Sequence, residues 1–379
     1  MAGFLLALKP CLTFLLFRSS PRTGAGFTLA VTLTWLLLVL GYAALDPPPR
    51  LSCSVKNTTL RWISGYLVLS AISLVWTTTN SPAIAAGYWA GMTADIVCIW
   101  VLLLYEPMQA NVLRIMRGFI AGTALLAVIA WSVPAMEDLR LGHEELLHPN
   151  LIGFEFAIAA LFAAYLAQQN RAWICLAGGF AVTLIRTLSK GAIGGFLFAG
   201  LYYLLCGLKV TRRARAYVGL AGVVVLVCFW GLLDAYLDLY TQGSNLETLT
   251  GRTYIWSQSL DIAIEQPWLG HGFDSFRWVF PPFNDFQPWH AHNELVQQFF
   301  AYGVVGLLIV IGVYWTFYQQ VRVSAIGGLR SLAMALLMLV LVRGLVDTDR
   351  FELCFPLWLM TLLSVSLAHR AGSHTPSLS

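Results

Sequence analysis

Long apolar stretches separated by short polar connectors run along almost the whole chain. Each stretch holds close to 20 residues, about the length that an α-helix needs to cross the hydrocarbon core of a bilayer. The alternation of apolar and polar residues expected of a membrane β-barrel is absent. Backbone groups in lipid must form hydrogen bonds within the protein, so the spans are expected to be α-helices. We therefore predict an all-α polytopic membrane protein with spans over 26–45, 60–76, 84–104, 114–133, 151–168, 172–188, 191–207, 216–235, 295–318, 329–346 and 353–368.

The start of the chain leaves one further span open. Residues 4–17 are apolar, but Lys9 and Pro10 stand in their middle, so the segment is either a short twelfth span or an interfacial helix. Basic connectors mark the cytoplasmic side of a membrane protein. Those at 114–117, 209–215, 322–330 and 369–370 share one side if the spans alternate. We prefer about 12 transmembrane helices, with both chain ends cytoplasmic.

This pattern divides the chain into four parts. Residues 1–235 form an N-terminal bundle of about nine spans, and 236–293 form one large loop on the outer face that contains short helices. Residues 294–370 form about three C-terminal spans, and 371–379 are a disordered tail.

Composition agrees with this picture. Hydrophobic residues make up 58% of the chain and charged residues 11%, with a mean hydropathy of +0.71. Soluble domains hold about 25% charged residues, which excludes that class. The net charge is +4, and the basic residues gather in short connectors and do not form a patch that would bind nucleic acid. The 7 cysteines lie mostly inside spans without CxxC spacing, so we predict packing roles and no cofactor.

The large loop ends in His290-Ala291-His292-Asn293, directly before an apolar span. An imidazole is half-titrated near neutral pH and can accept a proton from a sugar hydroxyl, so the favoured role for a histidine here is general base. A metal site with Glu294 as third ligand, or solvated histidines without a role, are the alternatives. Asn293 is placed to cap the following helix or to orient substrate.

Arg252 follows Thr248-Leu249-Thr250-Gly251 and precedes apolar residues at helical spacing that end at Pro267. This predicts a helix with Arg252 in its first turn, where backbone N–H groups and the helix dipole favour an anion. Its guanidinium adds bidentate recognition of phosphate. The alternative is a surface arginine paired with Glu247. Arg277 is a second arginine in the loop and a candidate supporting residue.

Arg186 and Lys190 lie four residues apart at the outer end of a span, which predicts two cations on one helix face. An anion should neutralise them near a membrane. It is either a carboxylate, Asp95 or Glu155, or a lipid diphosphate. Arg343 and Asp347 have the same spacing with opposite charge, which predicts an internal ion pair.

Aromatic residues crowd the loop and have two compatible interpretations. They suit a belt at the membrane interface, and they suit stacking against sugars or polyprenyl chains. These residues are Trp256, Trp268, Phe273, Phe276, Trp278, Phe280, Phe283, Phe286 and Trp289.

Taken together, the loop motifs resemble the O-antigen ligase and O-antigen polymerase superfamily. The elements are Gly251-Arg252 with Trp256, the run Pro267-Trp268-Leu269-Gly270-His271-Gly272, His292-Asn293, and Gly303-Val304-Val305-Gly306, within roughly 248–310. Upstream, His148-Pro149-Asn150 is similar to the family's Asp-Pro-Asn element and Ser189-Lys190-Gly191 to its Ser-Arg-Gly element. Histidine replaces aspartate in the first of these two, and lysine replaces arginine in the second.

The resemblance implies a metal-independent, inverting glycosyltransferase of the bacterial inner membrane that acts in lipopolysaccharide biosynthesis. The donor would be a glycan on undecaprenyl diphosphate, used at the periplasmic face. His292 would match the family's catalytic histidine and Arg252 its loop arginine. Lys190, or Arg186, would stand for the arginine of the Ser-Arg-Gly element, and Asn150 is a possible supporting residue together with His290, Asn293 and Arg277.

The residue types suit this chemistry. No nucleotide-sugar fold or ATP motif is present, so the donor must arrive already activated, as a lipid diphosphate does. We expect an O-antigen ligase that uses a sugar hydroxyl of lipid A-core as acceptor. The closest alternative is an O-antigen or exopolysaccharide polymerase with a second lipid-linked glycan as acceptor. A protein O-glycan ligase is a variant, and a transporter with Asp95, Glu155, Arg186 and Arg343 as pathway charges is a different class.

Overall fold

The computed structural model describes residues 1–17, 20–48, 57–134, 136, 139–143, 147–207, 211–213, 215–217, 219–220, 222–224, 227–228, 249–282 and 287–372. Over these residues the protein is α-helical and has no strand. The named helices are α1 (Ala2–Phe17), α2 (Pro21–Leu45), α4 (Thr58–Ser73), α5 (Pro82–Leu103), α6 (Met108–Ser132), α7 (Pro149–Leu166), α8 (Trp173–Arg186), α9 (Lys190–Cys206), α11 (Leu249–Ala263), α12 (Phe276–Val279), α13 (Glu294–Val323), α14 (Gly328–Gly344) and α15 (Leu357–Gly372).

Ten of the eleven apolar stretches predicted from the sequence coincide with helices, within a few residues at each end. The eleventh, 216–235, lies largely outside the described residues, as do 236–248 of the loop and 373–379 of the tail. Five helices among the described residues, α2, α5, α6, α7 and α13, are long and apolar enough to cross a membrane. The protein is thus a multi-pass membrane protein, and the total of twelve spans stays a prediction.

The N-terminal segment forms a helix, α1, that continues through Pro10. It runs beside α6 in the same direction: Gly3 lies against Ile115 near the start of α6, and Phe14 meets His143 beyond its end. Lys9 forms an ion pair with Asp95 on α5. A carboxylate partner for Lys9 removes much of the cost of a cation among apolar helices, which supports the option of a twelfth span.

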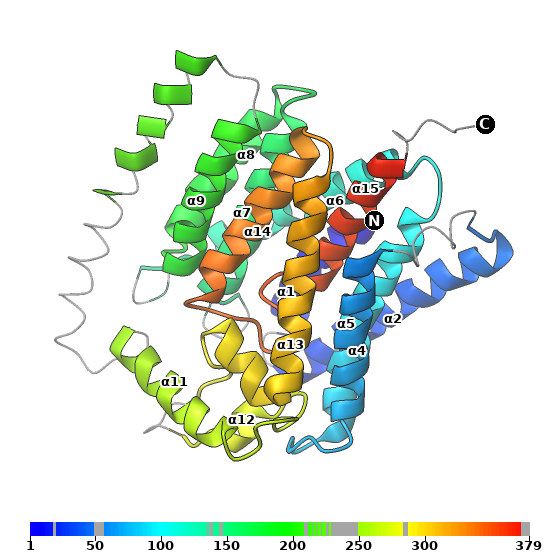
Figure 1. Ribbon diagram of the computed structural model, residues 1–379, viewed down its shortest axis with the longest axis vertical. Coiled ribbons are helices and arrows are strands. Elements are labelled where there is room, and N and C mark those ends of the chain that lie inside the picture. Colours follow the sequence, from blue (N-terminus) through cyan, green and yellow to red (C-terminus); the bar gives the residue numbers. More distant parts are fainter. Residues whose placement is uncertain are drawn as a thin grey trace.

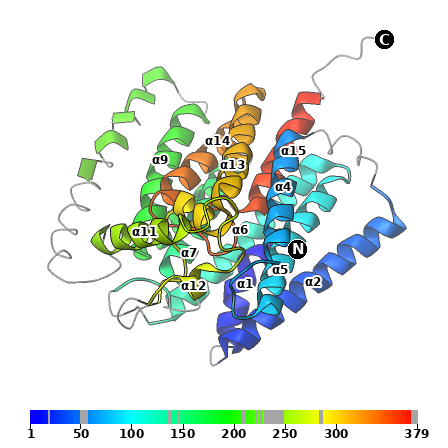
Figure 2. The same cartoon turned by 60° about the horizontal axis from the view of Figure 1, so that its bottom comes forward.

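The helices pack so that one end of the bundle carries the polar loop. The C-terminal ends of α4, α8 and α14 and the N-terminal ends of α5, α9 and α13 meet there, beside α11 and α12 (Figure 1). Figure 2, with this end turned forward, shows α11 and α12 in front of the bundle and α2 leaning away from it. These helix ends would also lie on one side of the membrane if the predicted spans crossed it in alternating directions.

A break in α13 fixes the loop to the bundle. Gly303 has φ 61° and ψ −157°, which interrupts the helix and releases backbone groups near the break. The segment 267–272 occupies this break: His271 N donates to Phe300 O at 3.0 Å, and Val304 N donates to Pro267 O at 2.8 Å. A Cβ on Gly303 would stand 2.4 Å from the backbone carbon of Trp268, so the two backbones can meet only at a glycine.

The loop aromatics divide into two groups. Phe276 and Phe280 are buried and form a small core with Ile255 of α11 and Phe300 of α13, and Phe273 is buried in the main core. Trp268, Trp278 and Trp289 are exposed. The sequence predicted a membrane belt or stacking on substrate for these aromatic residues, but not the packing of phenylalanines in a core. Phe283 and Phe286 lie outside the described residues.

Candidate active site

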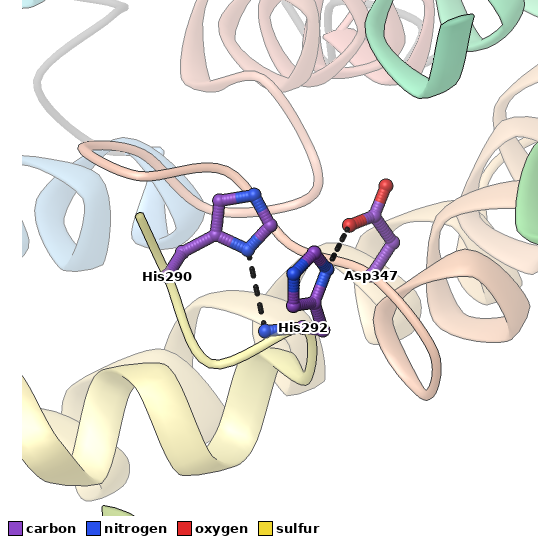
Figure 3. Close-up of side chains that lie close together, drawn as sticks. All are labelled: His290, His292 and Asp347. Carbon is purple, nitrogen blue, oxygen red and sulfur yellow. Dashed lines mark hydrogen bonds and ion pairs between the residues drawn. The ribbon is translucent and has the colours of Figure 1, made fainter. Parts of the chain in front are cut away.

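His292 and Asp347 meet at the loop end of the bundle (Figure 3). His292 precedes α13, and Asp347 follows α14 by three residues. Nδ1 of His292 lies 3.3 Å from Oδ1 of Asp347. The imidazole of His292 is 19% exposed and can be reached by a substrate, whereas the carboxylate of Asp347 is 6% exposed and is buried beneath it.

The charge of Asp347 fixes the tautomer of His292. Burial would raise the pKa of Asp347, but Arg343 and the hydrogen bond from His292 hold it well below its usual range. Asp347 is therefore ionised and can only accept a hydrogen bond, so Nδ1 of His292 carries the proton. The lone pair is then on Nε2, which is the state that a general base needs.

Arg343 supports this pair from the buried side. Its Nη2 lies 3.3 Å from Oδ2 of Asp347, and its side chain is 5% exposed. The guanidinium carbon also stands 4.3 Å above the ring of Phe154. The predicted internal ion pair is confirmed, and the structure adds that its carboxylate is shared with His292.

Arg252 reaches the same segment from α11. It stands in the first turn of that helix, as predicted, and its Nη1 donates to Val346 O at 2.6 Å. Val346 directly precedes Asp347, so Arg252 is anchored one residue from the carboxylate that orients His292. Its alternative partner, Glu247, lies outside the described residues.

Lys190 and Arg186 do not share a helix face, and that prediction was wrong. Helix α8 ends at Arg186 and α9 begins at Lys190, because the chain turns between them with Leu188 at φ 50°. Arg186 donates to Leu139 O at 3.2 Å and lies over Trp131. Asp95, one proposed counter-charge, pairs with Lys9 instead.

Lys190 begins α9 next to the candidate site. A Cβ on the following Gly191 would lie 2.9 Å from Val346 and 4.0 Å from Cβ of Asp347. The N-terminus of α9 therefore packs against the segment that holds Asp347 and anchors Arg252. Free N–H groups and the dipole at a helix N-terminus favour anions. The structure thus brings the α9 N-terminus, Arg252 and His292 to one stretch, 346–347.

Comparison with known proteins points to one superfamily. The family described as O-antigen ligase matches residues 172–311, which include Lys190, Arg252 and His292. The chain is 28% identical to an O-antigen ligase of Pseudomonas aeruginosa over 73% of its own length and 70% of the relative. It is 22% identical to the exopolysaccharide production protein ExoQ of Rhizobium meliloti over 82% and 75%. The family match and both relatives support the resemblance of this chain to the O-antigen ligase and polymerase superfamily.

That superfamily is a glycosyltransferase-like group of ligases and polymerases, and the motifs that resemble it have structural roles in this chain. The run Pro267–Gly272 and the run Gly303–Gly306 make the backbone contacts between segment 267–272 and the break in α13. Asn293 caps α13 as predicted, because its Oδ1 accepts from Val296 N at 3.2 Å. Its Nδ2 also donates to Leu345 O at 3.1 Å, which ties the start of α13 to the end of α14.

The histidine in place of aspartate at the Pro149-Asn150 motif keeps the local role of a cap. His148 accepts at Nδ1 from Asn150 N at 3.3 Å, at the start of α7. Asn150 in turn accepts from Arg140 at 2.7 Å, and Arg140 donates to Thr187 O in the turn between α8 and α9. Asn150 therefore supports the turn before Lys190 through Arg140.

His290 also lies at the site. Its Nδ1 accepts from the backbone N of His292 at 3.3 Å, and the two rings are 4.2 Å apart (Figure 3). Burial and the charges around it, His292 first, lower its pKa well below the usual value. His290, His292 and Asp347 offer ligand atoms within 4.8 Å of one another, so they could hold a metal ion. Glu294, the third ligand in the metal alternative, is not part of this group: it is buried and accepts from Tyr314 at 3.1 Å and from Cys354 N at 2.6 Å.

Backbone strain is concentrated around this region. His292 has φ 52°, Leu188 φ 50° and Asp274 φ 59°, values that side chains with a Cβ seldom adopt. Such conformations persist where surrounding contacts enforce them, and they often occur at functional sites. Here they turn the chain directly before α13, before Lys190 and before α12.

Two features of the site were missed by the sequence analysis. Asp347 was assigned to Arg343 alone, although it also orients His292. Arg350, which pairs with Asp274 at 2.7 Å, was not singled out. The signal was present in the polar run Asp347-Thr348-Asp349-Arg350 between two apolar spans. Arg277, the expected supporting residue, stacks on Trp289 at 3.7 Å, and Arg350 lies over the same ring at 4.8 Å.

Proposed function

We propose that this protein is an inverting glycosyltransferase of the bacterial inner membrane. It transfers glycan from undecaprenyl diphosphate to a sugar hydroxyl of lipid A-core at the periplasmic face. The observation that supports this most is the His292–Asp347 pair, whose supporting segment also anchors Arg252 and packs against the N-terminus of α9. A base and cations for a leaving diphosphate are the two requirements of the reaction.

The transfer proceeds in one displacement. Nε2 of His292 takes the proton of the acceptor hydroxyl as its oxygen attacks the anomeric carbon of the donor. The bond between that carbon and the phosphate oxygen breaks, and undecaprenyl diphosphate leaves with the electron pair. Arg252 and Lys190 stabilise the negative charge on the leaving diphosphate, and Asp347 stabilises the imidazolium.

Reconstitution tests this proposal. The purified protein in liposomes is given undecaprenyl diphosphate-linked glycan with lipid A-core in one reaction and without it in another. Glycan attached to lipid A-core is the expected product. If the protein forms no glycosidic bond with either the donor alone or the pair, the proposal is wrong.

A polymerase is the second candidate, because one relative bears the name of an exopolysaccharide production protein. It would use the same donor and the same base, with a second lipid-linked glycan in place of lipid A-core. The reaction without lipid A-core distinguishes the two: lengthened lipid-linked chains indicate a polymerase, and unchanged donor indicates a ligase.

The cluster of His290, His292 and Asp347 raises a separate question about mechanism. A metal ion held there would occupy His292 and leave it unable to act as base. We propose a metal-independent reaction, so prolonged treatment with EDTA should leave the rate unchanged. Loss of activity that returns with a specific divalent cation would assign the three residues to a metal.

A further inference from the structure

The segment that joins α14 to α15, residues 345–356, is irregular along its length and carries Asp347. It lacks the repeating hydrogen bonds of a helix, so other contacts must hold the carboxylate that orients His292. Its far end is also deeply buried, with Cys354 and Phe355 both 0% exposed. Buried backbone N–H groups need acceptors. Side chains of α13 meet both needs.

Glu294, in the first turn of α13, supplies an acceptor for this buried backbone. Its Oε2 accepts from Cys354 N at 2.6 Å and from the hydroxyl of Tyr314 at 3.1 Å. The Tyr314 oxygen accepts in turn from Phe355 N at 3.2 Å. Glu294 is 5% exposed, so these bonds are shielded from water and are strong. One carboxyl group thus holds two consecutive residues at the far end of the segment.

The near end of the segment is tied to the same turn of α13. Nδ2 of Asn293 donates to Leu345 O at 3.1 Å. A Cβ on Gly344 would lie 3.4 Å from Cβ of Glu294, so the end of α14 packs directly against this turn. Asn293 and Glu294 therefore fix the two ends of the segment from adjacent positions. Closing a segment at both ends restricts the residues between them, and Asp347 is one of these.

The thiol of Cys354 extends this restraint to Asp347. A backbone carbonyl can only accept, so Sγ of Cys354 donates to the backbone O of Asp347, at 3.1 Å. Arg343, which bonds Oδ2 of Asp347, also donates to Sγ at 3.7 Å. Oδ1 of Asp347 then meets Nδ1 of His292 (Figure 3). The contacts close into a ring, because one residue of chain separates His292 from Glu294.

We propose that Glu294 and Cys354 are positioning residues for glycan transfer, which hold the backbone of Asp347 where its carboxylate orients His292. This inference rests on the proposed function. Neither side chain contacts substrate in the proposed mechanism, so each acts through Asp347. Loss of either should therefore lower kcat and leave the KM values for donor and acceptor near wild type.

Two substitutions of similar size test the thiol. Cys354→Ser keeps a donor for the Asp347 carbonyl and should retain kcat within about three-fold. Cys354→Ala removes that donor and should lower kcat about ten-fold, because a buried carbonyl without its donor shifts and moves Asp347 with it. Both are measured in reconstituted protein with donor and acceptor saturating. Equal losses of kcat in the two variants would overturn the role of the thiol hydrogen bond.

A second pair of variants tests the carboxyl group. Glu294→Gln keeps an oxygen that can accept from Cys354 N and Tyr314, and should retain kcat within about three-fold. Glu294→Ala should lower kcat about ten-fold or more. If Glu294→Ala does not fold, Tyr314→Phe takes its place, because it removes the hydroxyl between Glu294 and Phe355; a kcat several-fold below wild type is expected. Wild-type kcat in these folded variants would overturn the role of Glu294.

The Asp347→Asn background shows whether the restraint acts through the carboxylate. There Cys354→Ala should lower kcat no further, because the anion that it positions is already gone. A second ten-fold loss on top of that of Asp347→Asn would overturn action through Asp347. A role in stability alone would not produce this coupling in kcat.

Gln320→Ala is the matched control for stability. Gln320 lies near the other end of α13 and ties it to α15 and α4: Nε2 donates to Ser364 O at 2.7 Å, and Oε1 accepts from Thr59 at 3.0 Å. Its loss should lower the temperature of thermal unfolding but leave kcat at wild type, because the 345–356 segment is untouched. A fall in kcat equal to that of Cys354→Ala would mean that kcat follows stability, and would overturn the inference.

The outcomes separate the positioning role from the proposed function. A wild type that transfers glycan, with Cys354→Ala and Glu294→Ala at wild-type kcat, overturns the positioning role alone. The same holds if these variants raise a KM and leave kcat unchanged. A wild type that forms no glycosidic bond overturns the proposed function and the inference with it.

Discussion

Replacement of Asp347 by asparagine separates the two roles of this carboxylate. In the folded protein one oxygen faces Arg343 and the other faces His292, both at 3.3 Å, and the side chain is 6% exposed. Asparagine is nearly the same size, but it leaves Arg343 buried without its counter-charge. Loss of one partner from a buried ion pair costs about 3–5 kcal/mol of folding free energy.

The same change should also lower kcat. A buried aspartate that orients a catalytic histidine contributes up to about 10⁴-fold. The bond here is longer than the usual 2.7–2.9 Å of a charge-assisted hydrogen bond, so we expect a smaller loss, about 100-fold, or about 2.7 kcal/mol. The KM values for donor and acceptor should change little, because Asp347 touches neither substrate in the proposed arrangement.

A double variant distinguishes stability from catalysis. Arg343→Met together with Asp347→Asn removes both buried charges and should recover most of the lost stability, measured by denaturation in detergent. Its kcat should stay about 100-fold low, because His292 still lacks the anion. If glycan transfer recovers together with stability, Asp347 acts only through the fold and the orienting role is refuted.

Three further predictions follow from particular contacts. Gly303→Ala should destabilise the protein by about 1–3 kcal/mol or more, because φ 61° is strained for alanine and the added Cβ would clash with the backbone of Trp268. The control is Gly65→Ala, which should be neutral or stabilising because a Cβ there has open space. Arg252→Lys should raise the KM for the donor roughly ten-fold, measured with saturating acceptor, because lysine keeps the charge but loses the planar fork; an unchanged donor KM would remove Arg252 from the diphosphate side. The pKa of His290 is lowered in the folded state, so its contribution to folding stability is complete above the unfolded pKa of about 6.5 and is lost as the pH is lowered towards the folded pKa. His290→Asn should make the folding stability less dependent on pH over this range. An identical pH dependence in both proteins would contradict this prediction.

The helices could be predicted from the sequence because hydrophobicity in a membrane protein is a local property. Each span needs only its own run of apolar residues, and caps such as Asn293 and breakers such as Pro267 are read within a few positions. The first turn of α11 and the pair Arg343–Asp347 were predicted for the same reason. The loop motifs of the superfamily resemblance likewise lie within roughly 248–310.

The parts that could not be predicted depend on contacts between distant segments. His292 and Asp347 are 55 positions apart, and Arg350 and Asp274 are 76 apart, so no spacing rule relates them. The wrong placement of Arg186 and Lys190 has another cause. Helical spacing holds only if the helix is continuous, and Leu188 in the left-handed region turns the chain between them.

The proposed mechanism depends on Nε2 of His292, which removes the proton from the acceptor hydroxyl. The most direct test is His292→Ala in purified, reconstituted protein, with undecaprenyl diphosphate-linked glycan and lipid A-core both supplied and thermal unfolding recorded alongside. The variant should fold, and no glycan should reach lipid A-core. Transfer at the wild-type rate by the folded variant would contradict it.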